Sequence, residues 1–244
     1  MSRIPFDLTR VAPIRRWMAR RSHALRMRKV QRFLEVMRPG PGAVVLDVGF
    51  APEGKEAGYG GFWAENLNPL ARFKSGGFQI IALSIDPFGD AIWNYPHMQF
   101  VRGDGRALPF KPQAVDFVFS NAVVEHVGSR ENQRQFVREC LTVARKGVFI
   151  TTPNYLFPVD PHLSVPFMHF LPRPLFGALA RLLGHPGLST VEGLNSLTAS
   201  SLQGCFTVAV QVHVEGIGLP LLPETLVAWV LHPLASGGGS ADTT

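Results

Sequence analysis

Three aspartates in the first half of the chain each close or follow a short apolar run. Asp47 lies in Val-Val-Leu-Asp-Val-Gly, Asp86 ends Ile-Ile-Ala-Leu-Ser-Ile-Asp, and Asp104 follows Phe-Val-Arg-Gly. If the apolar runs are parallel strands, their carboxyl ends meet at one edge of a sheet, where ligands bind. Carboxylates accept hydrogen bonds from hydroxyl and amino groups. The three positions therefore predict a pocket for a nucleoside-containing cofactor.

The elements that must position these aspartates can be read from the alternation of apolar and polar segments. We expect strands at 43–48, 78–84, 100–101, 114–120 and 147–151. We expect helices at 15–38, 62–72, 131–144 and 174–184. Strands that alternate with helices predict an α/β fold with a mostly parallel sheet and helices on both faces. Two later strands, at about 205–214 and 225–231, are expected to complete the sheet as an antiparallel pair.

Length and composition favour one domain with additions. The chain has 244 residues, of which 46% are hydrophobic, and this is enough for one sizeable core. We expect the domain at 39–235, with a cap-like insertion at 155–200. A basic helical extension at 1–38 precedes it, and a Gly/Ser-rich tail at 236–244 is predicted to be disordered.

The basic extension has two readings. Residues 1–38 hold eleven Lys and Arg against two acidic residues, and the rest of the chain holds thirteen against sixteen. A solvated helix face explains this, and so does contact with an anionic membrane surface or a nucleic acid. Trp17 is the one Phe, Tyr or Trp residue between the arginines at 15–32, and a nucleic-acid platform would require aromatic residues to alternate with the basic ones. We therefore favour the solvated face and keep peripheral membrane contact open.

Cysteine usage and hydropathy bear on location. The two cysteines, Cys140 and Cys205, form neither a disulfide framework nor a Cys-x-x-Cys metal site, which fits a reducing, cytoplasmic setting. We find no secretory signal and expect no transmembrane segment. The histidines lack metal-ligand spacing, so no metal site is expected.

A specific resemblance covers about residues 40–155. The segment Gly-Asp-Gly-Arg-Ala-Leu-Pro-Phe at 103–110, followed by Val-Asp-Phe-Val-Phe-Ser-Asn at 115–121, resembles class I S-adenosylmethionine-dependent methyltransferases. It is similar to the broad group with a Gly-Asp-x-x-x-Leu-Pro-Phe segment. The resemblance implies a Rossmann-like fold of seven strands with an antiparallel last strand. It also implies S-adenosylmethionine as the cofactor and methyl transfer as the activity.

The resemblance assigns roles to the residues after the strands. Asp86 would accept hydrogen bonds from the ribose hydroxyls, as acidic residues do here in dinucleotide folds. Asp104 would accept from the adenine amino group, and Gly105 would offer its backbone N–H to the ring. Ser120 and Asn121, at the end of the fourth strand, would lie near the methyl sulfonium.

The first turn departs from the family pattern. Asp47, Gly49 and Ala51 would hold the methionine end of the cofactor, but the family usually has Gly-x-Gly-x-Gly where this chain has Gly-Phe-Ala-Pro-Glu at 49–53. This departure motivates one alternative, a catalytically inactive scaffold or partner-binding subunit. The turn is also similar to that of ribose 2′-O RNA methyltransferases, a second alternative, although the strand at 147–151 lacks the lysine those enzymes use. A dehydrogenase is disfavoured because no full Gly-x-Gly-x-x-Gly follows a strand.

The acceptor side offers weaker signals. A hydroxyl acceptor benefits from a base with a pKa near 7, and His126 and His162 are the candidates, each with packing as a competing explanation. The segment 155–176 holds four phenylalanines and could form a lid over an apolar acceptor. We therefore predict methyl transfer to a small-molecule, lipid-linked or glycan-linked acceptor, on oxygen, with nucleic acid disfavoured.

Overall fold

Seven strands form one sheet in a computed structural model of the chain. The structure describes residues 12–51, 68–72, 77–160, 165–183, 186–207 and 211–232. Across the sheet the strands are β3 (Gln99–Arg102), β2 (Gln79–Ser84), β1 (Val44–Val48), β4 (Val115–Asn121), β5 (Ala144–Pro153), β7 (Pro223–Leu231) and β6 (His213–Gly218). The first five strands in this order pair in parallel, and β7 is antiparallel to both β5 and β6. This topology confirms the predicted fold class.

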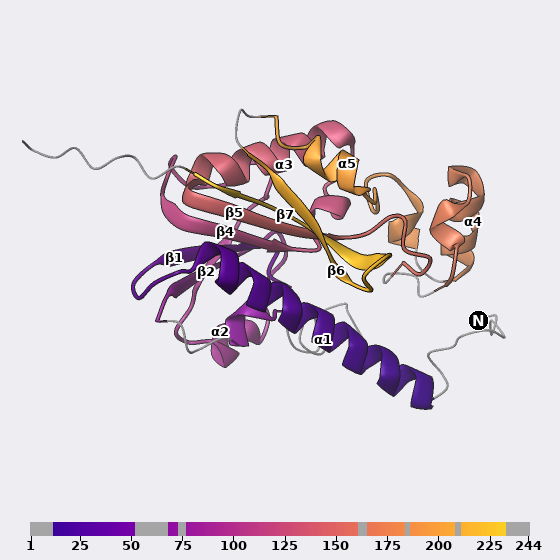
Figure 1. Cartoon of the computed structure of the whole chain (residues 1–244), viewed down its shortest axis with the longest axis horizontal. Helices are drawn as coiled ribbons and strands as arrows, with labels where there is room; N and C mark the ends of the chain where they lie inside the picture. Colours follow the sequence, from indigo (N-terminus) through magenta and orange to yellow (C-terminus); the bar gives the residue numbers. More distant parts are fainter. Residues whose placement is uncertain are drawn as a thin grey trace, which may run out of the picture.

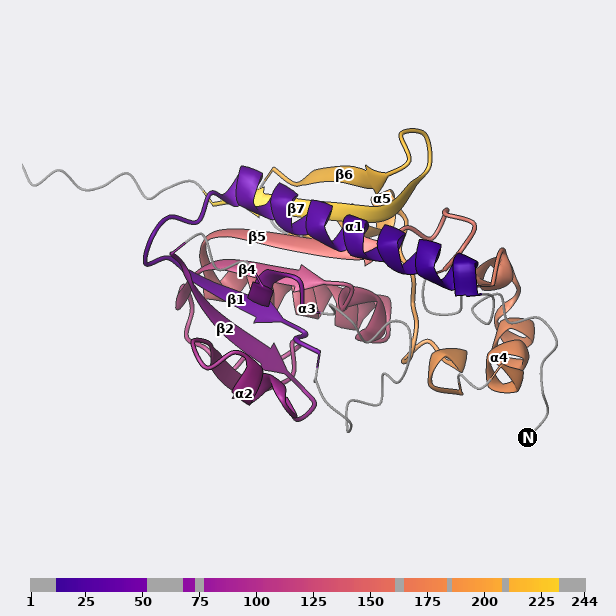
Figure 2. The ribbon, with the colours of Figure 1, turned by 90° about the horizontal axis from the view of Figure 1, so that it is seen from below.

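Helices cover both faces of the sheet (Figures 1 and 2). On one face lies α1 (Ala12–Met37), together with the short α2 (Ala91–Asn94). The ring of Phe33 in α1 contacts three rings of β4 and β5, Phe117, Phe119 and Phe149, with centroid distances of 6.5, 5.2 and 5.6 Å. Edge-to-face contacts of this kind add to the free energy gained by burying the rings. The aromatic cluster therefore fixes α1 against the centre of the sheet.

On the other face lie α3 (Arg130–Val143) and α5 (Ala199–Gln203). The N-cap of α3 is Ser129, whose hydroxyl accepts a hydrogen bond from the backbone N–H of Asn132 at 3.2 Å. Such a cap satisfies one of the N–H groups that a helix leaves unpaired at its start. Phe136, Val137 and Cys140 lie on the buried side of α3, as its amphipathic sequence predicted.

The segment after β5 contains helix α4 (Arg173–Leu182) and the short helical turns η4 (Met168–Phe170) and η5 (Pro186–Ser189). Met168, Phe176, Ala180 and Leu194 form a small hydrophobic cluster of their own. In Figure 2 the arrowheads of β4 and β5 point toward the side on which α4 lies, and the N-terminal half of α1 extends the same way. The carboxyl ends of the parallel strands therefore face the side of the molecule on which both additions lie.

Most predicted elements are present within two or three residues of their expected bounds, but some predictions were wrong. The strand expected at 205–214 was wrong in its start, because β6 begins only at His213; residues 208–210 lie outside the described residues. Two short helices were not predicted, α2 and α5, and α5 begins at the capping box that Thr198 and Ser201 form. Of the helix expected at 62–72, the described end is the single turn η2 (Leu70–Arg72), and 62–67 lie outside the described residues. The tail 236–244 also lies outside them.

No helix among the described residues is both long and apolar enough to cross a membrane.

Candidate functional site

Asp86 and Asp104 lie at the same edge of the sheet. Asp86 follows β2 and Asp104 follows β3, and these strands pair in parallel with Ser84 opposite Arg102. The backbone N–H of Gly103 donates to the carbonyl of Ser84 at 3.0 Å, which holds the two strand ends together. Two of the three predicted carboxylates are therefore brought to one rim, as the strand-end argument required.

The two rim carboxylates differ in their surroundings. Asp86 is exposed, and its carboxylate has no side-chain partner among the described residues. Asp104 is held by Arg106, whose guanidinium donates to Oδ2 at 2.6 Å and whose backbone N–H donates to Oδ1 at 2.8 Å. These hydrogen bonds hold the pKa of Asp104 below its usual value. Asp104 thus organises its own turn, whereas Asp86 is open to a ligand.

The third predicted carboxylate, Asp47, is buried in β1. Burial raises its pKa to about 7, because the charged form loses its hydration. The side chain therefore lies inside the sheet, below the rim that carries Asp86. The sequence placed it correctly at the end of a strand but did not reveal its burial.

Two predicted glycines are required by close packing. Gly49 has a φ of +90°, and a Cβ there would lie 2.1 Å from Val123 Cγ2. A Cβ at Gly105 would lie 2.6 Å from the ring of Phe136. Gly49 is also exposed, so its backbone is accessible at the end of β1. The structure thus gives physical reasons for glycine at both positions.

The altered first turn is held by contacts that the sequence analysis missed. Ala51 forms a reciprocal pair with the side chain of Asn68, with N–H to Oδ1 at 2.8 Å and Nδ2 to the carbonyl at 2.9 Å. Phe50 is buried against the rings of Phe88, Tyr95 and Phe100 at centroid distances of 5.9 to 6.1 Å. Packing and one buried amide therefore fix the turn in place of further glycines.

A buried polar centre lies at the ends of β4 and β5. Asn121 Oδ1 accepts hydrogen bonds from Lys29 Nζ at 3.1 Å and from Thr151 Oγ1 at 3.0 Å. Nearby, Glu125 in the helical turn η3 (Val124–His126) accepts from Thr152 Oγ1 at 3.0 Å through Oε2. Glu125 is fully buried, and within the part of the chain that the structure describes its Oε1 has no hydrogen-bond partner. The buried Oγ of Ser120, next to Asn121, likewise has no partner there.

Lys29 brings an amine from α1 into this centre. Burial lowers its pKa to about 8, while the charge of Glu125 raises the pKa and that of Arg26 lowers it. Asn121 is the one hydrogen-bond partner of Nζ among the described residues. An ammonium has three N–H donors, so a single neutral partner leaves the charged form poorly satisfied. Lys29 was predicted to lie on the solvated face of the basic helix, and this was wrong. Its position beside Val30 and four residues before Phe33 places it on the buried face of α1.

The two histidines proposed as bases have different outcomes. His126 is half-buried in η3, and its Nδ1 lies 2.6 Å from the carbonyl of Gly193, which connects η3 to the segment after η5. This contact gives the ring a packing role, and a role as base stays a prediction. His162 lies outside the described residues.

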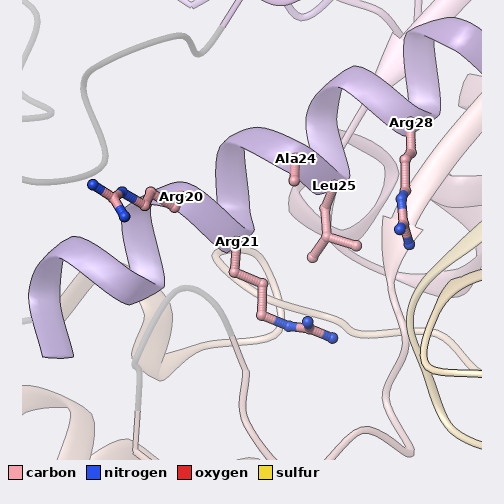
Figure 3. Close-up of a pocket in the computed structure, with 5 residues that line it drawn as sticks. All are labelled: Arg20, Arg21, Ala24, Leu25 and Arg28. Carbon is pink, nitrogen blue, oxygen red and sulfur yellow. The ribbon is translucent and has the colours of Figure 1, made fainter.

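Two cavities border this edge of the molecule. One, of about 250 Å³, follows α1 and is lined by Arg20, Arg21, Ala24, Leu25 and Arg28. Figure 3 shows the side chains of Arg21, Leu25 and Arg28 extending from the same side of the helix. The other, of about 310 Å³, lies between α3, α4 and the segment 194–201.

Comparisons with known proteins agree with this arrangement. The family model described as "Methyltransferase domain" matches residues 58–151. No curated protein matches the sequence.

Solved structures share the fold at low identity. A putative methyltransferase in complex with the Trm112 activator from Haloferax volcanii is 13% identical, with 96% of this chain and all of that chain covered, at a TM-score of 0.53. PH0226 from Pyrococcus horikoshii is 12% identical over 93% and 99% of the two chains, also at 0.53. A protein from Rhodobacter sphaeroides titled a putative Zn-dependent alcohol dehydrogenase is 15% identical over 83% and 88%, again at 0.53. At these identities each likeness shows the fold alone.

The order of the strands, the open carboxylate at the rim and the family match define the class of protein. Residues 58–151 match a methyltransferase domain and the sheet has the class I fold, and the cofactor of such a domain is S-adenosylmethionine. The residues at the rim fit this cofactor, because an exposed carboxylate at Asp86 can meet hydroxyl groups and the backbone at Gly49 is accessible. The chain therefore catalyses methyl transfer.

Proposed function

We propose that this methyltransferase acts on a hydroxyl oxygen of a small acceptor that is carried on a lipid or a glycan. The observation that carries the proposal is the buried centre formed by Lys29, Asn121 and Glu125 at the ends of β4 and β5. The centre combines the amine of Lys29, whose pKa is lowered to about 8, with the buried Oε1 of Glu125, which has no hydrogen-bond partner among the described residues. A hydroxyl group must lose a proton as it is methylated, and such a centre can receive that proton.

The rim residues would hold the cofactor that supplies the methyl group. Asp86 accepts hydrogen bonds from the ribose hydroxyls, since its carboxylate is exposed and unpaired. The turn that Asp104 organises faces the adenine, with Gly105 offering its backbone N–H. Gly49 and Ala51 lie at the methionine end. These assignments rest on the positions of the residues along one rim.

The proton moves to Lys29 Nζ in this proposal. S-adenosylmethionine would supply the methyl group from its sulfonium and leave as a neutral thioether, and the hydroxyl proton of the acceptor would go to the neutral amine of Lys29. Glu125 then stabilises the ammonium, because its charge already raises the pKa of Lys29. General-base assistance of this kind contributes about 100- to 10,000-fold to rate. The rest of the rate enhancement comes from the buried residues around the acceptor, which hold it in position for the reaction.

Exposed apolar residues after β5 favour a lipid or an apolar aglycone. Leu156, Phe167 and Phe170 are exposed, and they belong to the segment that follows β5 directly. Large apolar side chains at a sheet edge lined by polar groups are typical of a site for an amphipathic ligand.

Contact with an anionic membrane would bring a lipid-linked acceptor to the site. Arg20 and Arg28 are exposed on α1, and Leu221 between β6 and β7 is 98% exposed. Arg21 forms an ion pair with Glu224 in β7, which ties the basic helix to this β6–β7 connection. Arginines near an anionic surface contribute roughly 1 kcal/mol each, and an exposed leucine adds apolar insertion. A cytoplasmic location of the protein stays a prediction.

Membrane contact is tested by flotation of the full chain with vesicles of phosphatidylserine and phosphatidylcholine. Binding to the anionic vesicles should weaken in R28E and in L221D, whereas I92D, at an exposed position on α2, should bind as the unaltered protein does. Equal flotation of all four proteins would refute the contact.

The acceptor atom is tested with a matched pair of compounds. A long-chain alkyl glycoside and its analogue with an amino group in place of one hydroxyl are incubated with the full chain and methyl-labelled S-adenosylmethionine. We expect label on the glycoside oxygen. Label on the amine alone, or on added RNA alone, would overturn the proposal while leaving the methyltransferase assignment intact.

A further inference from the structure

The cavity of about 310 Å³ lies beside the polar centre but is separate from the cofactor rim. Its lining comes from the start of α3, the segment 155–171 that follows β5 and includes η4, the helix α4, and the segment 194–201 that runs into α5; its polar members include Arg130, His169 and Arg173. Its volume suits a small polar group attached to a larger ligand.

The cavity is positively charged. Arg130 and Arg173 both line it, and no Asp or Glu does so among the described residues. Within that part of the chain their hydrogen bonds go to neutral groups: Arg130 donates to Gln133 Oε1 at 2.7 Å and to the carbonyl of Ser196 at 2.9 Å, and Arg173 donates to the carbonyl of Leu194 at 2.6 Å.

The two guanidiniums are close enough to affect each other. Burial lowers the pKa of Arg130; Cys205 acts in the opposite direction and raises it, and the charges of Arg134 and Arg173 lower it. Arginines that share a cavity without a carboxylate favour an anion between them, because the repulsion is relieved and both present planar N–H donors.

His169 supplies an independent observation. It is only 8% exposed, its Nε2 lies 2.9 Å from the carbonyl of Tyr155, and its buried Nδ1 has no hydrogen-bond partner among the described residues. Because a carbonyl can only accept, Nε2 carries a hydrogen, and in the neutral ring Nδ1 is then an acceptor. A buried acceptor without a partner costs free energy that a ligand carrying a hydroxyl group can recover.

We propose that this cavity binds a phosphate group of the acceptor. Arg130 and Arg173 donate to the anionic oxygens, and His169 Nδ1 accepts from the hydroxyl of the phosphate in its protonated form. This inference rests on the proposed function, since it specifies the class of acceptor at the same site.

The cavity is joined to the polar centre through η3. The backbone N–H of Asn195, which lines the cavity, donates to the carbonyl of Glu125 at 2.7 Å. Tyr155 follows β5, whose Thr152 contacts the carboxylate of Glu125. A phosphate in the cavity therefore places the attached part of the acceptor within reach of the ends of β4 and β5.

Binding is measured by calorimetric titration of the full chain with inorganic phosphate and, separately, with acetate, at constant ionic strength and without cofactor. We expect phosphate to bind more tightly than acetate. R173M should weaken phosphate binding by about tenfold, as the loss of one charge-assisted pair predicts. The control R181M removes the same charge from α4 at a position outside the cavity and should leave the affinity within about twofold.

Absence of phosphate binding, preference for acetate, or equal weakening by R173M and R181M would overturn the inference. A thermal unfolding curve of each variant in phosphate-free buffer shows whether it is folded, and R173K, which keeps the charge, replaces R173M if the latter is not.

A kinetic arm connects the cavity to the reaction. Inorganic phosphate should inhibit methyl transfer competitively with the acceptor and not with S-adenosylmethionine. Inhibition independent of acceptor concentration would show that the cavity is not part of the acceptor site. Phosphate binding is measured without methyl transfer. The protein can therefore fail to bind phosphate and still methylate a hydroxyl group, or bind phosphate and not methylate one, and the two results are told apart.

Discussion

The rim formed by β1, β2 and β3 differs from the centre at the ends of β4 and β5 in how its polar groups are held. At the rim, Asp104 is fixed by Arg106 only two residues away, and Asp86 is exposed. At the centre, Lys29 reaches Asn121 across 92 positions, and Glu125 meets Thr152 across 27. The polar contact at the rim joins residues close in sequence, and part of the rim is exposed. The contacts at the centre join residues far apart in sequence, are buried, and leave polar atoms without partners among the described residues. In the proposed mechanism the cofactor is held by exposed, locally fixed groups, whereas the acceptor is activated by groups whose properties come from burial.

The strongest test of this comparison removes the amine of Lys29. We expect K29M to lower kcat by about 100-fold with the KM for S-adenosylmethionine nearly unchanged, because the proton acceptor is lost and the rim is intact. In the unaltered protein kcat should rise with pH up to about 8, since the neutral amine is required. K111M, at an exposed lysine, is the control.

A titration of Lys29 adds a readout that does not depend on turnover. The ¹³Cε resonance of Lys29, assigned by its absence in K29M, should titrate near pH 8 in the protein without cofactor. If K29M lost affinity for the cofactor while the pH dependence of kcat stayed unchanged, Lys29 would belong to cofactor binding. That result would contradict its assignment to the centre at the ends of β4 and β5.

At the rim, the removal of one carboxylate should act on affinity. D86A should weaken binding of S-adenosylmethionine by about 10- to 100-fold, because two hydrogen bonds to a charged group are lost, with a smaller effect on kcat. D90A removes an exposed carboxylate whose side chain makes no cap hydrogen bond and should bind the cofactor normally. Equal affinities of the two variants, measured by calorimetry, would remove Asp86 from the site.

The close packing beneath the rim predicts an effect on stability. G49A should lower the free energy of unfolding by about 3 kcal/mol, because the φ of +90° is unfavourable for alanine and the new Cβ meets Val123 at 2.1 Å. G40A has open space around its Cβ and should change stability by no more than about 0.5 kcal/mol. Urea denaturation measures both, and a similar loss in the two variants would contradict the packing argument.

Two buried aspartates should give pH dependences of opposite sign. The pKa of Asp47 is raised to about 7, so its contribution is complete below pH 4 and is lost as the pH rises through 7. Burial alone would raise the pKa of Asp116, but the backbone N–H of Val44 and the side chains of Arg145 and Lys146 lower it to about 2. Its contribution is therefore present above pH 4 and is lost as the pH falls through 2. D47N should remove the first dependence and D116N the second in unfolding free energies measured against pH.

The difference between contacts close in sequence and contacts far apart in sequence also explains what the sequence could predict. The alternation of apolar runs with helical segments predicted a mostly parallel sheet and the edge at which Asp86 and Asp104 lie, because both follow from the local pattern along the chain. The short helix α5 was missed although Thr198 and Ser201 signal its start, and the apolar residues after 205 led to a strand prediction that begins before β6 does. Asn68 and Lys29 were missed because their roles depend on partners that only the folded chain brings near. The spacing of Lys29 with Phe33 was the one available signal.

The aromatic anchor of α1 has a consequence for the rotational setting of that helix. Lys29 precedes Phe33 by four residues, slightly more than one turn, so both project from nearly the same side about 6 Å apart along the axis. The ring of Phe33 packs among those of Phe117, Phe119 and Phe149 and so fixes the rotation of α1. That rotation sets the depth and direction in which the side chain of Lys29 extends. One residue inserted between them would swing the lysine by about 100° and point it away from the strands while the ring stayed in place.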